Sequence, residues 1–239
     1  MTIPHYNIVF CTPGDMVFNT YNQSLLRTIK YLNSQNITWT WMNDSSPHIA
    51  KTRALILNHG YAGNDGFGEF PHEYKVKDWQ VFSGQFTYDQ IVWIDNDISW
   101  QVEDFVRLIN HQEEVVSGVY MFGDSPNHVV ISMEPGSVLH IDDLAAMNQN
   151  ELHEVHTCGM GFLKVRYGVT EQLQHPIFLV RDYDYFNKRI NQMISYKTTD
   201  EDTSFCHRVR ESGRRVFFDP KIRVNHYKRV LLVPPEQKC

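Results

Sequence analysis

Two aspartates, one residue apart, follow a short apolar run near the middle of the chain. Residues 91–94 are all apolar, as in strands buried on both faces of a parallel sheet, and Asp95-Asn96-Asp97 comes directly after them. In open α/β sheets, ligands bind just beyond the carboxyl ends of the strands. Two carboxylates at that edge suit Mg²⁺ or Mn²⁺, whose other ligands are usually water and substrate phosphates. Acidic turns are common, so the position after a buried strand is what favours a metal site.

A second polar group is expected at the same edge of the sheet. It comprises the turn Thr12-Pro13-Gly14 after the first predicted strand, Asp44 after the second, and Arg53 on the helix that opens there. An acceptor-rich turn and a guanidinium suit a nucleotide, with polar contacts to base and ribose and a fork for a diphosphate. Ordinary turn chemistry and a surface arginine would explain the same residues, and this alternative stays open.

Three consecutive acids, Asp200, Glu201 and Asp202, stand directly before a predicted helix. Carboxylates at this position can simply cap the helix and complement its dipole. Because three adjacent acids repel one another, a functional role is the competing interpretation. A carboxylate held near an acceptor hydroxyl is what a general base requires.

A histidine near the end of the chain is a candidate third component of the metal site. His226 follows a short predicted strand, and Lys228 and Arg229 come after it. Neutral imidazole could complete a metal shell that already has two carboxylates. The alternatives are a partly buried structural histidine and basic residues that face solvent rather than phosphate oxygens.

The elements that position these residues alternate in type along the first half of the chain. Strands are predicted at residues 6–10, 37–42, 91–94 and 115–121, and helices at 20–34, 46–60 and 105–113. Ser46 and Pro47 are a strong helix start, and Gly60 is the expected helix end. The order predicts a wound α/β sheet with right-handed crossovers.

The second half is more irregular. We predict an antiparallel excursion at 129–132 and 138–140, a mobile segment at about 142–156 with a possible short helix, and a strand entered through Gly159 and Gly161. Two glycines there require something to approach the backbone closely. Residues 186–194 are helical at best, a helix around Phe205 ends at Gly213, and short strands at 216–218 and 222–224 flank Asp-Pro. Residues 60–79 are either a long functional loop or an inserted hairpin.

Composition limits the function classes. The 239 residues suit one large α/β domain, and a net charge of −6 argues against a general nucleic-acid binder. No signal peptide and no membrane-spanning run is recognisable. The four cysteines lack Cys-x-x-Cys spacing, so reduced cysteines in a cytoplasmic protein are expected.

Taken in order, these parts resemble the GT-A-fold glycosyltransferases, the nucleotide-sugar-dependent type to which many family 2 enzymes belong. The matching parts are the first strand with its Thr-Pro turn, the helix from Ser46 to Arg53, Asp95-Asn96-Asp97, the Gly159-to-Phe162 strand, Glu201-Asp202 and the closing Val-x-His at 224–226. Each of these motifs is weak evidence alone, but six of them in the expected order are more specific. The central Asn96 and residues 60–79 depart from the commonest pattern. The Gln-x-x-Arg-Trp element of processive membrane synthases is missing.

The resemblance implies a role for each candidate residue. Asp97, Asp95 and His226 would hold Mn²⁺ or Mg²⁺, with Asp95 also at the nucleotide ribose. Asp202 would be the catalytic base, with Glu201 orienting the acceptor. Thr12, Pro13, Asp44 and Arg53 would bind the nucleotide, and Gly159 and Gly161 the acceptor.

The expected protein is therefore a single GT-A domain over residues 1–239, with a nucleotide-binding half at about 1–121 and an acceptor-binding half at about 122–239. It would move one hexosyl or pentosyl group from a UDP- or GDP-type sugar to a glycan or glycoconjugate hydroxyl, with inversion. One alternative is a nucleotidyltransferase, although residues 11–19 hold one glycine and no basic residue where that class has a Gly-rich, Arg-containing loop. The other is a catalytically silent carbohydrate-binding relative.

Overall fold

The structure is a computed structural model that describes residues 2–58, 80–123, 125, 127–174, 176–187, 191–196 and 200–228. The predicted loop or hairpin at 60–79, the helix end at Gly60 and Arg229 lie outside these residues. Within the described part of the chain, no helix is long and apolar enough to cross a membrane.

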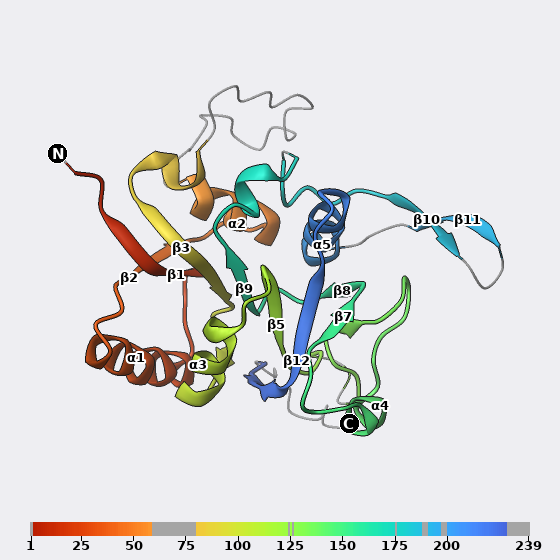
Figure 1. Ribbon diagram of the computed structural model, residues 1–239, viewed down its shortest axis with the longest axis horizontal. Coiled ribbons are helices and arrows are strands. Elements are labelled where there is room, and N and C mark those ends of the chain that lie inside the picture. The colour runs from red at the N-terminus through yellow and green to blue at the C-terminus, as the bar shows by residue number, and fades with distance from the viewer. Residues whose placement is uncertain are drawn as a thin grey trace, which may run out of the picture.

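A seven-stranded sheet forms the centre of the molecule, in the order β2-β1-β3-β9-β5-β12-β7 (Figure 1). The strands are β1 (His5–Pro13), β2 (Trp39–Asp44), β3 (Thr87–Ile94), β5 (Val115–Val119), β7 (His153–Val155), β9 (Phe162–Arg166) and β12 (Val216–Arg223). β9 is antiparallel to β3 and β5, and β7 is antiparallel to β12. The other three pairs are parallel. Five of the seven strands therefore run in one direction and only β7 and β9 run in the other, which confirms the predicted mostly parallel sheet.

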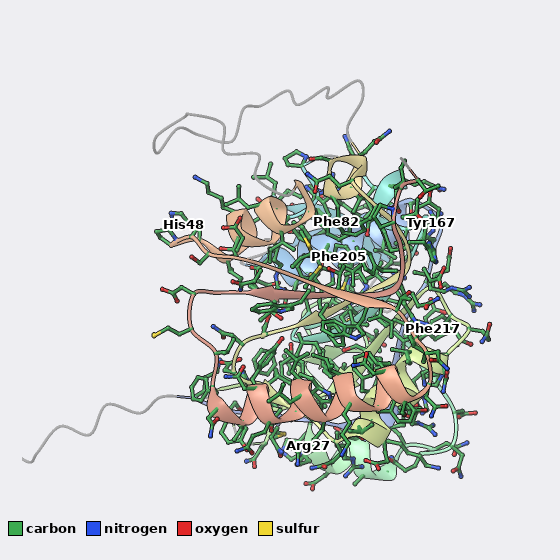
Figure 2. All side chains as sticks on the ribbon, turned by 90° about the vertical axis from the view of Figure 1, so that its left-hand side faces the viewer. Arg27, His48, Phe82, Tyr167, Phe205 and Phe217 are labelled. Atoms are coloured by element: carbon green, nitrogen blue, oxygen red, sulfur yellow. The ribbon has the colours of Figure 1, made fainter. Side chains whose placement is uncertain are left out.

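Apolar side chains cover both faces of this sheet, which explains the unbroken apolar runs of its strands. Val9 and Ile91 belong to one buried cluster, whereas Phe10 and Val92 belong to the other. Helices α2 (Ile49–Asn58) and α5 (Glu201–Glu211) pack on the first face, and α1 (Asn19–Ser34) and α3 (Val102–Asn110) on the second (Figure 1). Figure 2 labels Phe205 of α5, which is buried in the first cluster, and Arg27 of α1, which is exposed.

The remaining described elements are short. They are β4 (Ile98–Ser99) paired with β13 (Asn225–His226), β6 (Ile131–Ser132) paired with β8 (Thr157–Cys158), the hairpin of β10 (Tyr183–Asn187) and β11 (Gln192–Tyr196), the helix α4 (Ile141–Ala146) and the 3₁₀ turns η1 (Val81–Gly84) and η2 (Thr170–Gln172). The β10–β11 hairpin projects from the body of the molecule (Figure 1).

The predicted helix starts and stops are close to the observed ones. The Ser46 hydroxyl accepts a hydrogen bond from the His48 amide at 3.1 Å, and α2 begins at Ile49. Gly213 follows α5 with a φ of +82°, the left-handed conformation that often ends a helix. The excursion at 129–140 is also observed, since the Val129 amide donates to the Leu139 carbonyl at 3.1 Å.

Two predictions in the second half are wrong. Of the predicted helix at 186–194, the described residues 186–187 and 192–194 lie in the paired strands β10 and β11, and Asn191, directly before β11, has a φ of +53°. The alternating sequence Tyr183-Asp184-Tyr185 is typical of a strand. The possible short helix within 142–156 is observed as α4, which begins at Ile141, whereas β7 was not predicted.

The second wrong prediction concerns β12. Residues 216–218 and 222–224 are not two separate strands, because β12 runs unbroken through Asp219-Pro220. The register shifts between Phe218 and Arg223, so Pro220 occupies an irregularity where no ladder amide is needed.

Candidate active site

The turn after β3 is fixed by contacts with two other strand ends. The Asp95 amide donates to the Gly161 carbonyl at 3.0 Å, which extends the β3–β9 pairing by one residue. The Asn96 side chain donates to the Met16 carbonyl at 2.6 Å and ties the turn to the loop after β1. A Cβ on Gly14, whose φ is +119°, would lie 2.3 Å from the Asn96 amide nitrogen. Gly14 is therefore required for this close approach.

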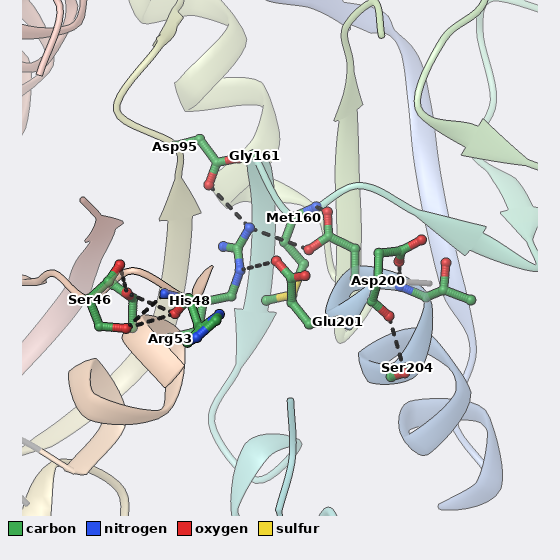
Figure 3. A network of polar contacts seen from close by, with 12 residues as sticks. Ser46, His48, Arg53, Asp95, Met160, Gly161, Asp200, Glu201 and Ser204 are labelled. Carbon is green, nitrogen blue, oxygen red and sulfur yellow. Dashed lines mark hydrogen bonds and ion pairs between the residues drawn. The ribbon is translucent and has the colours of Figure 1, made fainter. Parts of the chain in front are cut away.

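One buried guanidinium lies among three carboxylates at this edge of the sheet (Figure 3). Arg53 Nη2 is 3.2 Å from Asp95 Oδ1 and 3.3 Å from Asp202 Oδ1, and Arg53 Nε is 3.3 Å from Glu201 Oε1. The Arg53 side chain is only 2% exposed, and its guanidinium lies 5.6 Å from the centre of the Trp93 ring. Its Nη1 is buried without a hydrogen-bond partner. Arg53 thus joins the end of β3 to the start of α5. We call Arg53 and its three carboxylates, Asp95, Glu201 and Asp202, the Arg53 hub.

The charge imbalance shifts the ionisation of these groups. Burial raises the pKa of Asp202 to about 7, the carboxylates of Glu201 and Asp95 add to the effect, and Arg53 opposes it. Burial alone would lower the pKa of Arg53, but the three carboxylates raise it. Arg53 therefore stays charged, whereas Asp202 can exchange a proton near neutral pH.

The three consecutive acids at the start of α5 make different contacts. Asp200 is the N-cap, and its carboxylate accepts from the Thr203 amide at 2.6 Å. Glu201 pairs with Arg53. The Asp202 Oδ2 accepts from the Met160 amide at 3.0 Å, and its buried Oδ1 is ion-paired with Arg53. The capping interpretation is thus correct for Asp200, while Asp202 faces the site.

A second charged group surrounds Asp97. Because β13 pairs with β4 and places His226 opposite Ile98, His226 Nε2 lies 3.3 Å from Asp97 Oδ2. Lys228 Nζ is 2.9 Å from the same oxygen. Burial alone would raise the pKa of Asp97, but these two partners lower it. Burial would likewise lower the pKa of His226, yet its contacts with Asp97 and Met121 raise it.

The donor set at Asp97 fits a divalent ion only in part. His226 Nδ1 donates to the Met121 carbonyl at 2.8 Å, which orients the ring and leaves Nε2 for a ligand, as in many metal sites. One carboxylate and one imidazole suit Mn²⁺ when substrate phosphates supply further ligands. However, no three His, Cys, Asp or Glu side chains cluster as a metal site within the described residues.

The expected nucleotide group is not assembled as the sequence predicts. Thr12 and Pro13 are buried, and the Thr12 hydroxyl is bonded to the Tyr21 hydroxyl and, at 3.0 Å, to the Trp41 indole. The Thr12 side chain is therefore not at an open edge. Asp44 does lie at the end of β2, where its carboxylate accepts from the Ser45 amide at 2.7 Å. Arg53 contacts the carboxylates of the hub rather than these residues, and it is not a surface arginine.

Tyr120 is a site residue that sequence reasoning missed. Its hydroxyl accepts from the Gly161 amide at 2.8 Å, and its ring centre lies 5.3 Å from that of His226. A Cβ on Gly159 or Gly161 would lie 2.2 or 2.7 Å from this hydroxyl, so Tyr120 is the group whose approach requires both glycines. Its position directly after a buried strand is the signal that could have identified it.

A cavity of about 170 Å³ opens beside Asp202. Its walls come from the β6–β8 ribbon with the turn between residues 132 and 138, from Tyr183 on β10, and from the first turn of α5. Gly159 is part of this lining, whereas Gly161 is not. Of residues 142–156, only His156 lines this cavity.

The chain resembles solved structures in its fold, but its sequence matches no protein family. No protein-family model and no curated protein matches it. The crystal structure of GalNAc-T7 with UDP, GalNAc and Mn²⁺ matches 94% of this chain and 44% of that chain, with a TM-score of 0.53 and 8% identity. The crystal structure of A197 from STIV matches 97% and 100%, with a TM-score of 0.47 and 15% identity. At 8% identity, the likeness to GalNAc-T7 shows the fold alone. The fold is of the GT-A type.

Proposed function

We propose that this protein is a metal-dependent glycosyltransferase that moves one sugar from a nucleoside-diphosphate donor to a hydroxyl acceptor. The observation that carries the proposal is the Asp202 carboxylate, which lies between the Arg53 hub and the cavity. The Met160 amide fixes its Oδ2, Arg53 pairs with its buried Oδ1, and the side chain is 25% exposed. A base fixed in this way, with a pKa near the operating pH, can accept the proton of an attacking hydroxyl.

The donor side of the proposal rests on Asp95, Asp97 and His226. Asp97 and His226 would hold a Mn²⁺ or Mg²⁺ ion, and Asp95, fixed by Arg53, would face the donor ribose. A bound divalent ion would neutralise charge on the departing diphosphate. Lys228, already beside Asp97, would add a cation for the same phosphates. Asp44, at the end of β2, would contact the nucleobase of a UDP- or GDP-type donor.

Asp202 as the base implies inversion at the anomeric carbon, because the acceptor attacks directly from the opposite face. Glu201 would orient the acceptor only indirectly, since its carboxylate is directed toward Arg53. The acceptor would be a hydroxyl of a glycan or glycoconjugate.

A catalytically silent carbohydrate-binding protein is a second candidate. It is favoured by Lys228, whose ammonium group neutralises Asp97 without any metal. It would retain the cavity and have no use for a donor nucleotide.

A thermal-unfolding screen separates the two candidates. UDP, GDP and their sugars would each be added with Mn²⁺ and, as the matched control, with EDTA. A donor at 100 times its dissociation constant adds about 2.7 kcal/mol of stability. The proposal expects stabilisation by one nucleotide type that EDTA abolishes, followed by turnover of the corresponding donor sugar. Unchanged unfolding with every nucleotide in Mn²⁺ would contradict it and favour the silent protein.

A further inference from the structure

The cavity beside Asp202 has one apolar side and one acidic side. Ile131 is buried in its wall, while Phe122 and Val138 are 40% and 47% exposed and lie where the cavity meets solvent. Asp200 and Asp202, from the start of α5, also line the cavity. A ligand of this cavity must therefore present both an apolar surface and hydrogen-bonding groups.

The two serines on the wall do not offer hydrogen-bond donors to a ligand, whereas the two aspartates are accessible. The Ser132 and Ser137 hydroxyls both donate to the Glu134 carbonyl, at 2.6 and 2.7 Å, so they fix their own turn. The Asp202 side chain is 25% exposed, and Asp200 is exposed. A matching ligand carries hydroxyl donors for these carboxylates.

The charge of the cavity restricts the ligand further. Of the described residues that line it, none is a lysine or an arginine. Burial, together with the charge of Arg210, lowers the pKa of His156 to about 4, so this imidazole is neutral at pH 7. A carboxylate or phosphate on the ligand would meet two aspartates and no lining cation, which is strongly unfavourable.

The size of the cavity sets the last limit. At about 170 Å³ it is smaller than the roughly 300–1,000 Å³ of usual ligand pockets, so it encloses one small ring rather than an oligosaccharide. A lone hydroxymethyl group, such as that of a serine, would leave most of it unfilled.

We propose that this cavity selects a neutral sugar ring as the acceptor, with its C–H surface on Val138 and Phe122 and its hydroxyls toward Asp200 and Asp202. Acidic sugars and sugar phosphates are excluded by the two carboxylates. This inference rests on the proposed function in one respect, since the bound sugar is an acceptor only if the protein is a glycosyltransferase. The binding of a neutral sugar does not depend on it.

Saturation-transfer NMR on the full chain, without donor or metal, tests the inference directly. The probes are methyl glucoside, galactoside and mannoside, each paired with its methyl uronate. At least one neutral glycoside should receive saturation, and its uronate partner should bind about tenfold more weakly or worse, because like charges repel. Stronger binding of the uronates, or no saturation of any neutral glycoside, would overturn the inference.

Two exposed valines provide a matched pair of variants. Val138→Trp fills the cavity mouth and should abolish saturation transfer, whereas Val180→Trp, at a position that is 39% exposed and does not line the cavity, should leave it unchanged. Phe122→Asp is a second variant at the mouth and should also weaken neutral-sugar binding. If Val138→Trp binds like the original protein, the cavity is not the sugar site. A protein that binds neutral sugars but no nucleotide would refute the glycosyltransferase while leaving this inference intact.

Discussion

Asp95 and Asp97 lie on one turn and are separated by a single residue, yet the cations that contact them differ in number and in burial. Asp95 shares the Arg53 guanidinium, which is 2% exposed, with Glu201 and Asp202. Asp97 pairs with His226 and with Lys228, whose side chain is 47% exposed. The first group has one cation for three carboxylates, and the second has up to two cations for one.

This difference separates a fixed group from an exchangeable one. Arg53 cannot leave its carboxylates without exposing buried charge, so the hub holds β3 and α5 in one geometry. Lys228 can swing into solvent and give up its place at Asp97, because exposed ion pairs contribute little to stability. The rigid group around Arg53 therefore suits a catalytic base that is in position before substrate binds. The group around Asp97 suits a ligand that binds and dissociates.

The largest expected effect tests the base on the fixed side. Asp202→Asn keeps the shape and the hydrogen bond from Met160 but cannot accept a proton, so turnover should fall by about 10²–10⁴-fold. Steady-state kinetics would measure the loss, and titration with donor and Mn²⁺ should show unchanged binding. Asp143→Asn, at an exposed position on α4 that does not line the cavity, is the matched control. Equal activity of the two variants would show that the acidic turn is purely structural.

The next effect concerns stability and contrasts the two groups directly. Arg53→Met leaves three carboxylates without their cation and should lower the free energy of unfolding by about 3–5 kcal/mol. Asp97→Asn should cost under about 1 kcal/mol, as for other partly exposed pairs. Urea denaturation measures both, with the exposed Arg27→Met on α1 as a control near zero. Similar losses for the Arg53 and Asp97 variants would remove the distinction between the groups.

Metal linkage is the third expected effect. In the original protein, saturating UDP or GDP with Mn²⁺ should add about 2.7 kcal/mol at 100 times the dissociation constant. Asp97→Ala should lose this gain while unfolding normally without ligand. Since His226 must be neutral to bind a metal, Mn²⁺ binding should strengthen as pH rises through its raised pKa. Nucleotide binding that is equal in Mn²⁺ and EDTA would contradict the exchangeable site.

The pH dependence is the smallest of these effects. The pKa of Asp202 is raised from 3.8 to about 7, and a base acts only when deprotonated. The kcat/KM should therefore rise about tenfold per pH unit below about pH 7 and level off above it, because kcat/KM reports ionisation of the free enzyme. A profile that is already level at about pH 5 would show that Asp202 is not the titrating base.

The sequence was most informative where strands end. The apolar run before Asp95 and the alternating elements predicted both the α/β class and the edge that gathers Asp95, Asp97, Asp202 and His226. The local sequence is sufficient at these positions. Buried strands and capped helices have a characteristic spacing of apolar residues, and characteristic residues mark where they start and end.

The partners of each charge could not be predicted in the same way. Nothing local to Arg53 indicates that its guanidinium is buried against Glu201, which is 148 positions away. Likewise, the antiparallel insertion of β9 between β3 and β5 decides that Gly161 meets Tyr120, and strand order is a property of the whole fold. The hairpin at β10–β11 was mistaken for a helix because its apolar residues also satisfy a loose helical spacing.

The anomeric configuration of the product tests the central claim most directly. The donor that stabilises the protein would be incubated with Mn²⁺ and a neutral methyl glycoside, and the new linkage would be assigned by NMR from its anomeric coupling. Direct attack assisted by Asp202 predicts a product whose anomeric configuration is opposite to that of the donor. A product that retains the donor configuration would contradict Asp202 as the base of a single displacement.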